Sequence, residues 1–355
     1  MTPVELLEHC EKRIPFNIMR SLLKDKDMPT HAGWSKTVSA YKDRLEEDPS
    51  FVAKVLSLES VYKHYLLAGD KVVSIYKITD DITDAMLRFT NSFDINNVRK
   101  TASVYIGNYP FPVKDLTQIN DDVEIVYSTN TNGKLTLGFC STRKIEEHVK
   151  VAIDELDTST QANFSEYTEL FGTKRYRRQL FDFVVIDTIN NYVEYRIDAS
   201  NGLSVKDIEK SLSRTKATFL TMLHGTDVDD NKLLAHNLFP KINTLYDSNE
   251  GRVCELSFTV DSGGTFNERM RGTDIDIRNE EFHSAGMQAV EKINTYKIAI
   301  RWPVDKDNEE NKLELELLLN SSMIETYNTR PTLFSASILK CYTVGQYNAL
   351  LAKIL

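Results

Sequence analysis

The sequence has few cysteines, and they are far apart. No two of the four have the spacing of a zinc ligand pair, and such dispersed thiols also exclude a scaffold built on disulfides. The pattern is typical of a reducing compartment, so we expect free thiols in an intracellular protein. The four residues are Cys10, Cys140, Cys254 and Cys341.

Long hydrophobic runs are also missing. A helix needs about 20 consecutive apolar residues to cross a bilayer, and no stretch of the sequence approaches this length. At the N-terminus, Thr2 and Glu5 have the spacing of a helical capping box, and Pro3 suits the first helical position. This start predicts a folded helix rather than a secretion signal. We therefore expect a soluble cytoplasmic protein with no membrane contact.

The sequence lacks the signatures of several large enzyme classes. It contains no phosphate-binding loop, dinucleotide fingerprint, nucleophile elbow or paired-histidine zinc motif. These absences argue against a Rossmann or P-loop enzyme, but they leave open whether the chain is an enzyme at all. The formal net charge of −9 argues against a protein coated with nucleic acid, although it is compatible with a local basic groove.

The clearest structural pattern lies between residues 180 and 223. The apolar segment 180–187 predicts a strand, and residues 192–198 alternate apolar and polar side chains, which predicts a half-exposed return strand. Asn190 and Asn191 tolerate the left-handed backbone of a turn. Ser204 then begins a capping-box pattern. The helix that follows has apolar residues at helical spacing: Val205, Ile208, Leu212, Phe219 and Leu223.

The order of predicted elements indicates an α+β fold. A helical N-terminal domain is expected over residues 1–70, a small α+β region over 71–170, and a C-terminal α+β domain over 171–355, built on the hairpin and helix just described. Helices and strands do not alternate regularly, which favours a mixed or mostly antiparallel sheet. The polar stretch 141–173 predicts a helix followed by a loop at a domain boundary. Asn132-Gly133 predicts a tight hairpin turn.

A basic cluster stands out in this acidic chain. It consists of Lys174, Arg175, Tyr176, Arg177 and Arg178. Cations beside an aromatic ring can neutralise phosphates while a base stacks on the ring, so the cluster predicts contact with nucleic acid. The alternative is a solvated edge strand whose charges prevent pairing with another sheet. In a strand, Lys174, Tyr176 and Arg178 would share one face.

The predicted hairpin carries a possible catalytic group. Asp187 lies at the end of one strand, with Glu194 and Arg196 on the next. Metal-dependent nucleases use an acid and a Glu-x-Lys on neighbouring strands to hold Mg²⁺ and orient water. Arginine stays protonated, so Arg196 fits the lysine position poorly. The alternative is an ordinary hairpin, in which alternation alone explains the residues.

Two further acidic groups could bind a metal. Asp274 and Asp276 flank Ile275 and could bind Mg²⁺, but an edge strand before an acidic helix start explains them equally. His224 precedes an acidic stretch that could bind a metal or form a surface loop. The acids of that stretch are Asp227, Asp229 and Asp230.

Three functions are consistent with these patterns. The first is a non-catalytic subunit of an intracellular, microbial multiprotein complex. This subunit would contact nucleic acid through residues 174–178, and the complex could act in host defence. The second is a Mg²⁺-dependent nuclease or phosphodiesterase using Asp187 and Glu194, with Asp274 or Asp276. The third is a scaffold that contacts a protein partner or a second copy of itself. Only the nuclease requires a cofactor.

Overall fold

The computed structural model describes residues 1–98, 105–117, 119, 121–131, 133–200, 203–226, 228, 230–271, 274–304 and 313–355. Its strands are β1 (Lys71–Ile78), β2 (Glu124–Thr131), β3 (Lys134–Val151), β4 (Leu170–Asp187), β5 (Tyr192–Asp198), β6 (Leu233–Ala235), β7 (Arg252–Val260), β8 (Thr265–Arg269), β9 (Ile293–Pro303), β10 (Glu314–Asn320) and β11 (Ala336–Leu339). Its α-helices are α1 (Pro3–Arg13), α2 (Phe16–Asp25), α3 (Trp34–Glu47), α4 (Phe51–Leu56), α5 (Leu58–Ala68), α6 (Thr83–Ser92), α7 (Thr158–Asn163), α8 (Val205–Met222), α9 (Phe239–Asp247), α10 (Glu281–Ala289) and α11 (Val344–Leu351). Short 3₁₀ helices are η1 (Asp80–Ile82), η2 (Ile95–Asn97), η3 (Ile153–Glu155), η4 (Asp230–Lys232), η5 (Ile277–Asn279) and η6 (Met323–Tyr327).

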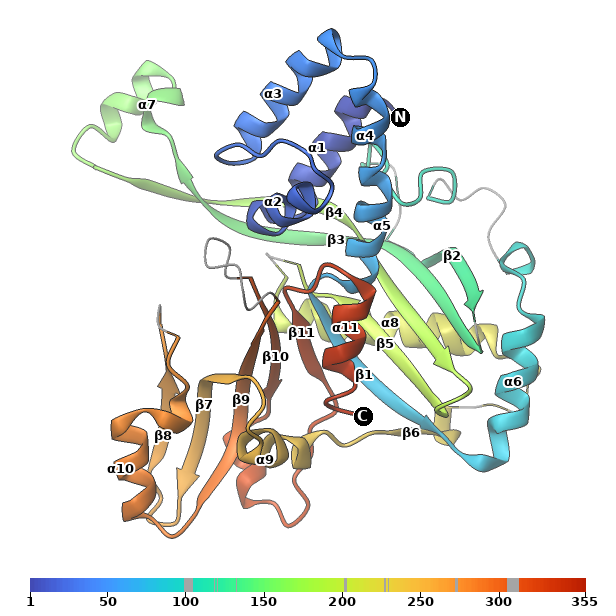
Figure 1. Cartoon of the computed structure of the whole chain (residues 1–355), viewed down its shortest axis with the longest axis vertical. Helices are drawn as coiled ribbons and strands as arrows, with labels where there is room; N and C mark the ends of the chain where they lie inside the picture. The colour runs from blue at the N-terminus through green and yellow to red at the C-terminus, as the bar shows by residue number, and fades with distance from the viewer. Residues whose placement is uncertain are drawn as a thin grey trace.

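Within the described residues the strands form one antiparallel sheet (Figure 1). They follow the order β2-β3-β4-β5-β1-β11-β10-β9-β7-β8, and β6 pairs with β1 beside this path. The expected α+β class with an antiparallel sheet and N-terminal helices is therefore confirmed. None of the helices in the described part of the chain has the length and hydrophobicity needed to span a membrane.

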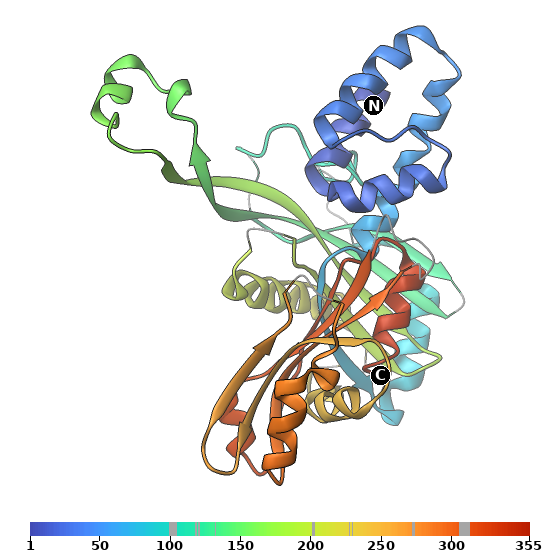
Figure 2. The same cartoon turned by 60° about the vertical axis from the view of Figure 1, so that its left-hand side comes forward.

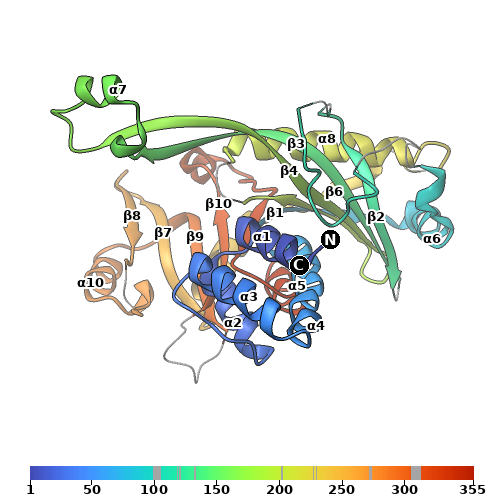
Figure 3. The same ribbon diagram turned by 90° about the horizontal axis from the view of Figure 1, so that it is seen from above.

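Helices cover both faces of the β3–β5 part of the sheet. Seen from above, α1 to α5 lie on one side of these strands and α8 lies on the other (Figure 3). Leu6, Leu7 and Cys10 of α1 are fully buried in the core beneath the N-terminal helices, which also contains Phe181 and Phe183 of β4. The N-terminal helices are thus packed against the sheet through a shared hydrophobic core.

The hairpin and helix expected from residues 180–223 are confirmed. Val184 pairs with Tyr195 in the β4–β5 ladder, and Asn191 adopts the left-handed backbone with φ 55°. Ser204 caps α8, because its hydroxyl accepts a hydrogen bond from the amide of Asp207 in a complete capping box. The expected half-exposure of β5 is wrong, since every residue of this strand is buried. Strand β5 is covered on both faces and therefore belongs to the interior.

Replacing Ser204 by alanine is expected to lower the free energy of unfolding by about 1 kcal/mol, the usual cost of losing an N-cap oxygen. The hydroxyl is exposed, so the substitution removes the cap without opening a cavity. Urea denaturation measures the change. Threonine at this position keeps the hydroxyl and should retain most of the stability, whereas an unchanged midpoint for alanine would mean that the cap contributes nothing.

The expected helix and loop over residues 141–173 is wrong. Strands β3 and β4 instead continue as one ladder from the Lys134↔Asp187 pair to the Val151↔Leu170 pair, and only α7 and short turns join them. Cross-strand charges stabilise the outer part, where Glu146 lies opposite Arg175. We call residues 144–177 the arm, and Figure 2 shows it extending away from the N-terminal helices.

The domain boundary that the sequence predicts at residue 170 falls at the start of strand β4. Asn132 of the predicted Asn-Gly turn lies outside the described residues, but β2 and β3 on either side pair as that turn requires.

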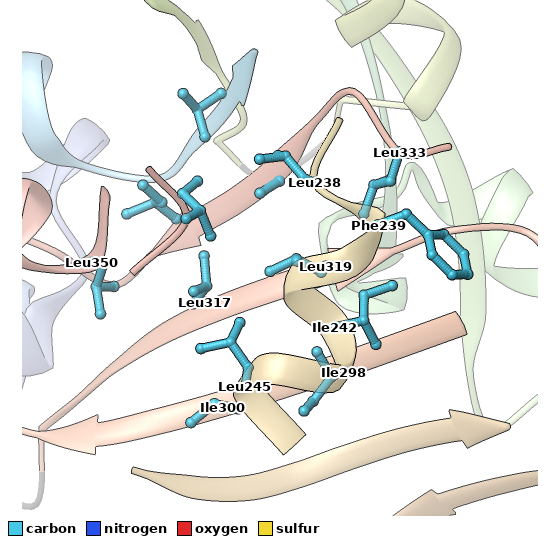
Figure 4. Close-up of a cluster of buried hydrophobic side chains, with 14 of the residues drawn as sticks. Leu238, Phe239, Ile242, Leu245, Ile298, Ile300, Leu317, Leu319, Leu333 and Leu350 are labelled. Atoms are coloured by element: carbon cyan, nitrogen blue, oxygen red, sulfur yellow. The ribbon is translucent and has the colours of Figure 1, made fainter. Parts of the chain in front are cut away.

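The second half of the sheet has its own core (Figure 4). Helix α9 lies across β9 and β10, with Ile242 and Leu245 packed into the same core as Ile298 and Leu317. Cys341 is buried in this core, and all four cysteines of the chain are free thiols. The expected dispersal of the cysteines is therefore confirmed.

Candidate nucleic-acid interface

A cleft of about 1010 Å³ lies between the N-terminal helices, the segment 107–116 and strand β4. Helices α1 and α5 form one wall, and residues 176–181 of β4 form another. Strand β5 pairs with β4 only from Phe183 to Asp187 in the described chain, so this part of β4 has no sheet neighbour on that edge. The cleft thus opens where β4 leaves the body to enter the arm.

The cleft is locally positive in an acidic protein. Its lining residues include five cations and two carboxylates, Glu5 and Glu8. Lys114 is 89% exposed on its side chain, and its ammonium group lies 3.1 Å from the Glu5 carboxylate. The cations come from three separate parts of the chain: Lys12, Arg13, Lys114, Arg177 and Arg178.

Aromatic rings lie between these charges. The ring of Phe111 stacks on Tyr62 with centroids 5.0 Å apart, and its other neighbour is His9 at 5.1 Å. Tyr109 packs edge-on against Phe181 at 5.7 Å. Burial lowers the pKa of His9 below its ordinary value, so this ring is neutral at neutral pH. The lining therefore combines positive charge with aromatic side chains that pack on one another.

The structure divides the predicted basic cluster into two parts. Tyr176, Arg177 and Arg178 line the cleft, while Lys174 and Arg175 lie farther out on the arm and do not line it. Arg175 donates a hydrogen bond of 2.6 Å to Glu146 on the neighbouring strand. Arg175 thus pairs with a carboxylate across the β3–β4 ladder.

Arg177 builds the wall of the cleft. Its guanidinium donates hydrogen bonds of 2.7 Å to the Leu116 carbonyl and 2.5 Å to the Ile119 carbonyl. It also contacts Asp121 at 2.5 Å and the Thr142 hydroxyl at 2.7 Å. With these acceptors occupied, Arg177 holds the segment beside the cleft in place and is poorly placed to bind a phosphate as well.

A buried ionic cluster underlies the cleft. The Asp198 carboxylate pairs with Arg13, and with the Lys71 ammonium at 3.6 Å, and the side chains of both Asp198 and Lys71 are fully buried. Burial raises the pKa of Asp198, but the neighbouring Arg13, Lys71 and Arg143 outweigh it and hold this pKa well below its ordinary value. Burial also lowers the pKa of Lys71 to about 8. Arg13 thereby links α1, a wall of the cleft, to the end of β5.

A second buried pair lies beside the first. Arg143 pairs with Asp182, whose carboxylate also accepts a hydrogen bond of 3.2 Å from Thr215 of α8. The Asp198 amide donates to Asp182 at 2.8 Å, and Arg143 donates to the Asp198 carbonyl at 3.2 Å. The two pairs form one network that connects α1, the sheet and α8. Sequence reasoning missed this network, although Asp182 stands between Phe181 and Phe183 in an apolar stretch of strand.

The predicted catalytic acids of the hairpin have structural partners. Asp187 anchors the turn by accepting hydrogen bonds from the amides of Ile189 and Asn190 at 3.1 and 3.0 Å. Glu194 is fully buried, contacts Arg196 at 2.9 Å and accepts a hydrogen bond from the Tyr347 hydroxyl. The Arg196 guanidinium lies 4.1 Å from the centre of the Tyr347 ring. Glu194 and Arg196 therefore form a buried pair that attaches α11 to the sheet.

The structure does not bring Asp274 and Asp276 close to the predicted catalytic acids of the hairpin. Asp276 caps η5 by accepting a hydrogen bond of 2.9 Å from the Arg278 amide and pairs with its guanidinium at 2.6 Å. Asp274 precedes η5, which contacts β7, and four strands separate β7 from β5 in the sheet. Within the described chain, no three His, Cys, Asp or Glu side chains are placed to bind a metal. Asp227 and Asp229 lie outside the described residues.

Comparison with known proteins adds no family to these observations. No protein-family model matches the sequence, and no curated protein matches it significantly. The functional argument therefore rests on the geometry and chemistry of the cleft.

Proposed function

We propose that this protein binds single-stranded nucleic acid in the cleft between α1 and β4, as a non-catalytic subunit of a multiprotein complex. The observation that supports the proposal most strongly is the cleft lining, which includes five cations, two carboxylates and several aromatic side chains. Cations that follow a phosphate backbone, interleaved with stacking rings, are the usual chemistry of single-strand binding sites.

We assign the ligand contacts from the positions of the side chains in the cleft. Lys12 of α1 and Lys114 of the segment 107–116 are exposed, and Arg178 and Tyr176 line the cleft from β4. Arg13 and Arg177 contribute positive potential, but their guanidinium groups are occupied by Asp198 and by the loop acceptors. We assign phosphate contacts to the exposed Lys12 and Lys114 and to Arg178, which also donates a hydrogen bond to the Ser200 hydroxyl, with base stacking on Tyr176.

The test is a titration of labelled single-stranded DNA and RNA at several salt concentrations. Three phosphate contacts predict that the logarithm of affinity falls with the logarithm of salt at a slope of about −2. Replacing Lys12 and Lys114 by glutamine should weaken binding to every sequence alike and reduce the slope by about 1.4, because phosphates carry no base identity. Tyr176→Ala should cost a further 1–3 kcal/mol, roughly, through the lost stacking.

A matched control keeps the charge change and moves it away from the cleft. Lys206 and Lys210 are exposed on α8, which covers the other face of the sheet, and their replacement by glutamine should leave affinity and slope unchanged. The proposal fails if the wild type shows no binding at low salt. It also fails if the cleft variant and the α8 variant bind equally well.

A further inference from the structure

The tip of the arm has a distinctive composition. Residues 152–169 carry five carboxylates and neither lysine nor arginine. Lys150 of β3 lies 2.5 Å from the Glu169 carboxylate and offsets one of these charges, so the tip remains strongly negative. The acids are Asp154, Glu155, Asp157, Glu166 and Glu169.

Aromatic side chains are exposed on the tip and at the adjoining start of β4. Tyr167 is 60% exposed and Phe171 is 69% exposed, while Phe164 contacts Tyr167 with ring centroids 5.8 Å apart. Large aromatic rings are costly to leave in water, and a group of them on a projecting segment marks a surface that binds another molecule. The tip thus combines negative charge with rings, the complement of the positive aromatic cleft.

The tip cannot reach the cleft of its own chain. Arg177 lines the cleft, and the β4 strand continues outward from it to Leu170, a distance of about 23 Å at the rise of an extended strand. The β3–β4 ladder is paired through Val151 and Leu170, so the strand cannot fold back without breaking these pairs. Figure 2 shows the tip at the end of the arm, away from the N-terminal helices. Any contact between tip and cleft is therefore made between two molecules.

We propose that two copies of this chain associate by reciprocal exchange of their arms, with the acidic tip of each copy seated in the basic cleft of the other. A two-fold arrangement makes the same contact twice, so each contact strengthens the other. Tyr167 and Phe171 supply rings that can pack on the aromatic lining, and Glu166 lies beside them to meet Lys12 or Lys114. The dimer competes with nucleic acid for the cleft, but its formation does not depend on the proposed function.

Charge reversal tests this contact on the protein alone, by sedimentation velocity across a concentration series without nucleic acid. We expect a wild-type dimer that dissociates as salt is raised. A tip variant with Glu166→Lys and Glu169→Lys should dimerise at least about tenfold more weakly, since like charges then face each other. A cleft variant with Lys12→Glu and Lys114→Glu should show the same loss.

Mixing the two variants provides the decisive measurement. Each tip then meets a cleft of opposite sign in both directions, so the mixture should form a heterodimer although neither variant dimerises alone. The control reverses Glu46 and Glu47, two exposed acids of α3 away from the cleft, and should dimerise like the wild type. A wild type that stays monomeric at every concentration overturns the proposal. So does a mixture that fails to associate.

Discussion

Replacing Asp198 by asparagine is expected to lower the free energy of unfolding by about 3–5 kcal/mol, the usual cost of removing one partner from a buried ion pair. The variant keeps the shape of the side chain but leaves Arg13 and Lys71 buried without the carboxylate that they share. Chemical denaturation of the two proteins at neutral pH measures the difference. Asp154→Asn makes the same change on the exposed arm tip and should stay within about 0.5 kcal/mol of the wild type.

Acid should remove the difference in stability between the wild type and the Asp198→Asn variant. The folded pKa of Asp198 is depressed, so its contribution is fully present above the unfolded pKa of about 3.9 and is lost as pH falls from there towards the folded value. Wild type and variant should therefore converge below pH 4, approximately. Replacing all three members of the group by apolar residues should restore much of the lost stability, because no charge is then left unpaired. A variant as stable as the wild type at neutral pH would show that the cluster contributes nothing.

Replacing Phe219 by alanine is expected to cost about 3–5 kcal/mol, the range measured for phenylalanine deletions in cores. The side chain is fully buried where α8 crosses the sheet, and its ring meets Tyr195 edge-on with centroids 6.0 Å apart. The lost area and the remaining cavity both oppose folding. Thermal or chemical denaturation against the wild type measures the cost.

Phe282 of α10 provides the matched control, because it is 72% exposed and undergoes the same chemical change. Its replacement by alanine should alter the free energy of unfolding by no more than about 0.5 kcal/mol. Equal losses for the two variants would mean that α8 is not attached through Phe219.

Local pattern was sufficient for the hairpin of β4 and β5 and for α8. The apolar run, the strict alternation and the serine cap each depend on neighbours within a few residues, and the structure has all three. The outer part of β3 could not be predicted in this way. Residues such as Glu146 and Glu147 favour a helix when read alone, and they become strand residues because Arg175 and Lys174 lie opposite them.

Burial of the polar face of β5 depends on still more distant residues. Glu194 is buried with Tyr347, which follows it by about 150 residues, and Asp198 is buried with Arg13, which precedes it by nearly 190. Alternation correctly placed these side chains on one face, but it carries no information on what covers that face. The cleft escaped prediction for the same reason, because its cations lie on three separate segments.

The position of β1 has a consequence for synthesis on the ribosome. Lys71 of β1 pairs with Ile338 of β11, about 270 residues later, while the other neighbours of β1, β5 and β6, are complete at Asp198 and Ala235. At a synthesis rate of roughly 5–20 residues per second, about 7–30 s pass between the synthesis of β5 and that of β11. Until β11 is made, the part of β1 from Lys71 to Val73 has unpaired amides and carbonyls at the edge of the sheet. The nascent chain thus has a period of heightened exposure to aggregation, which ends only when its last strand arrives.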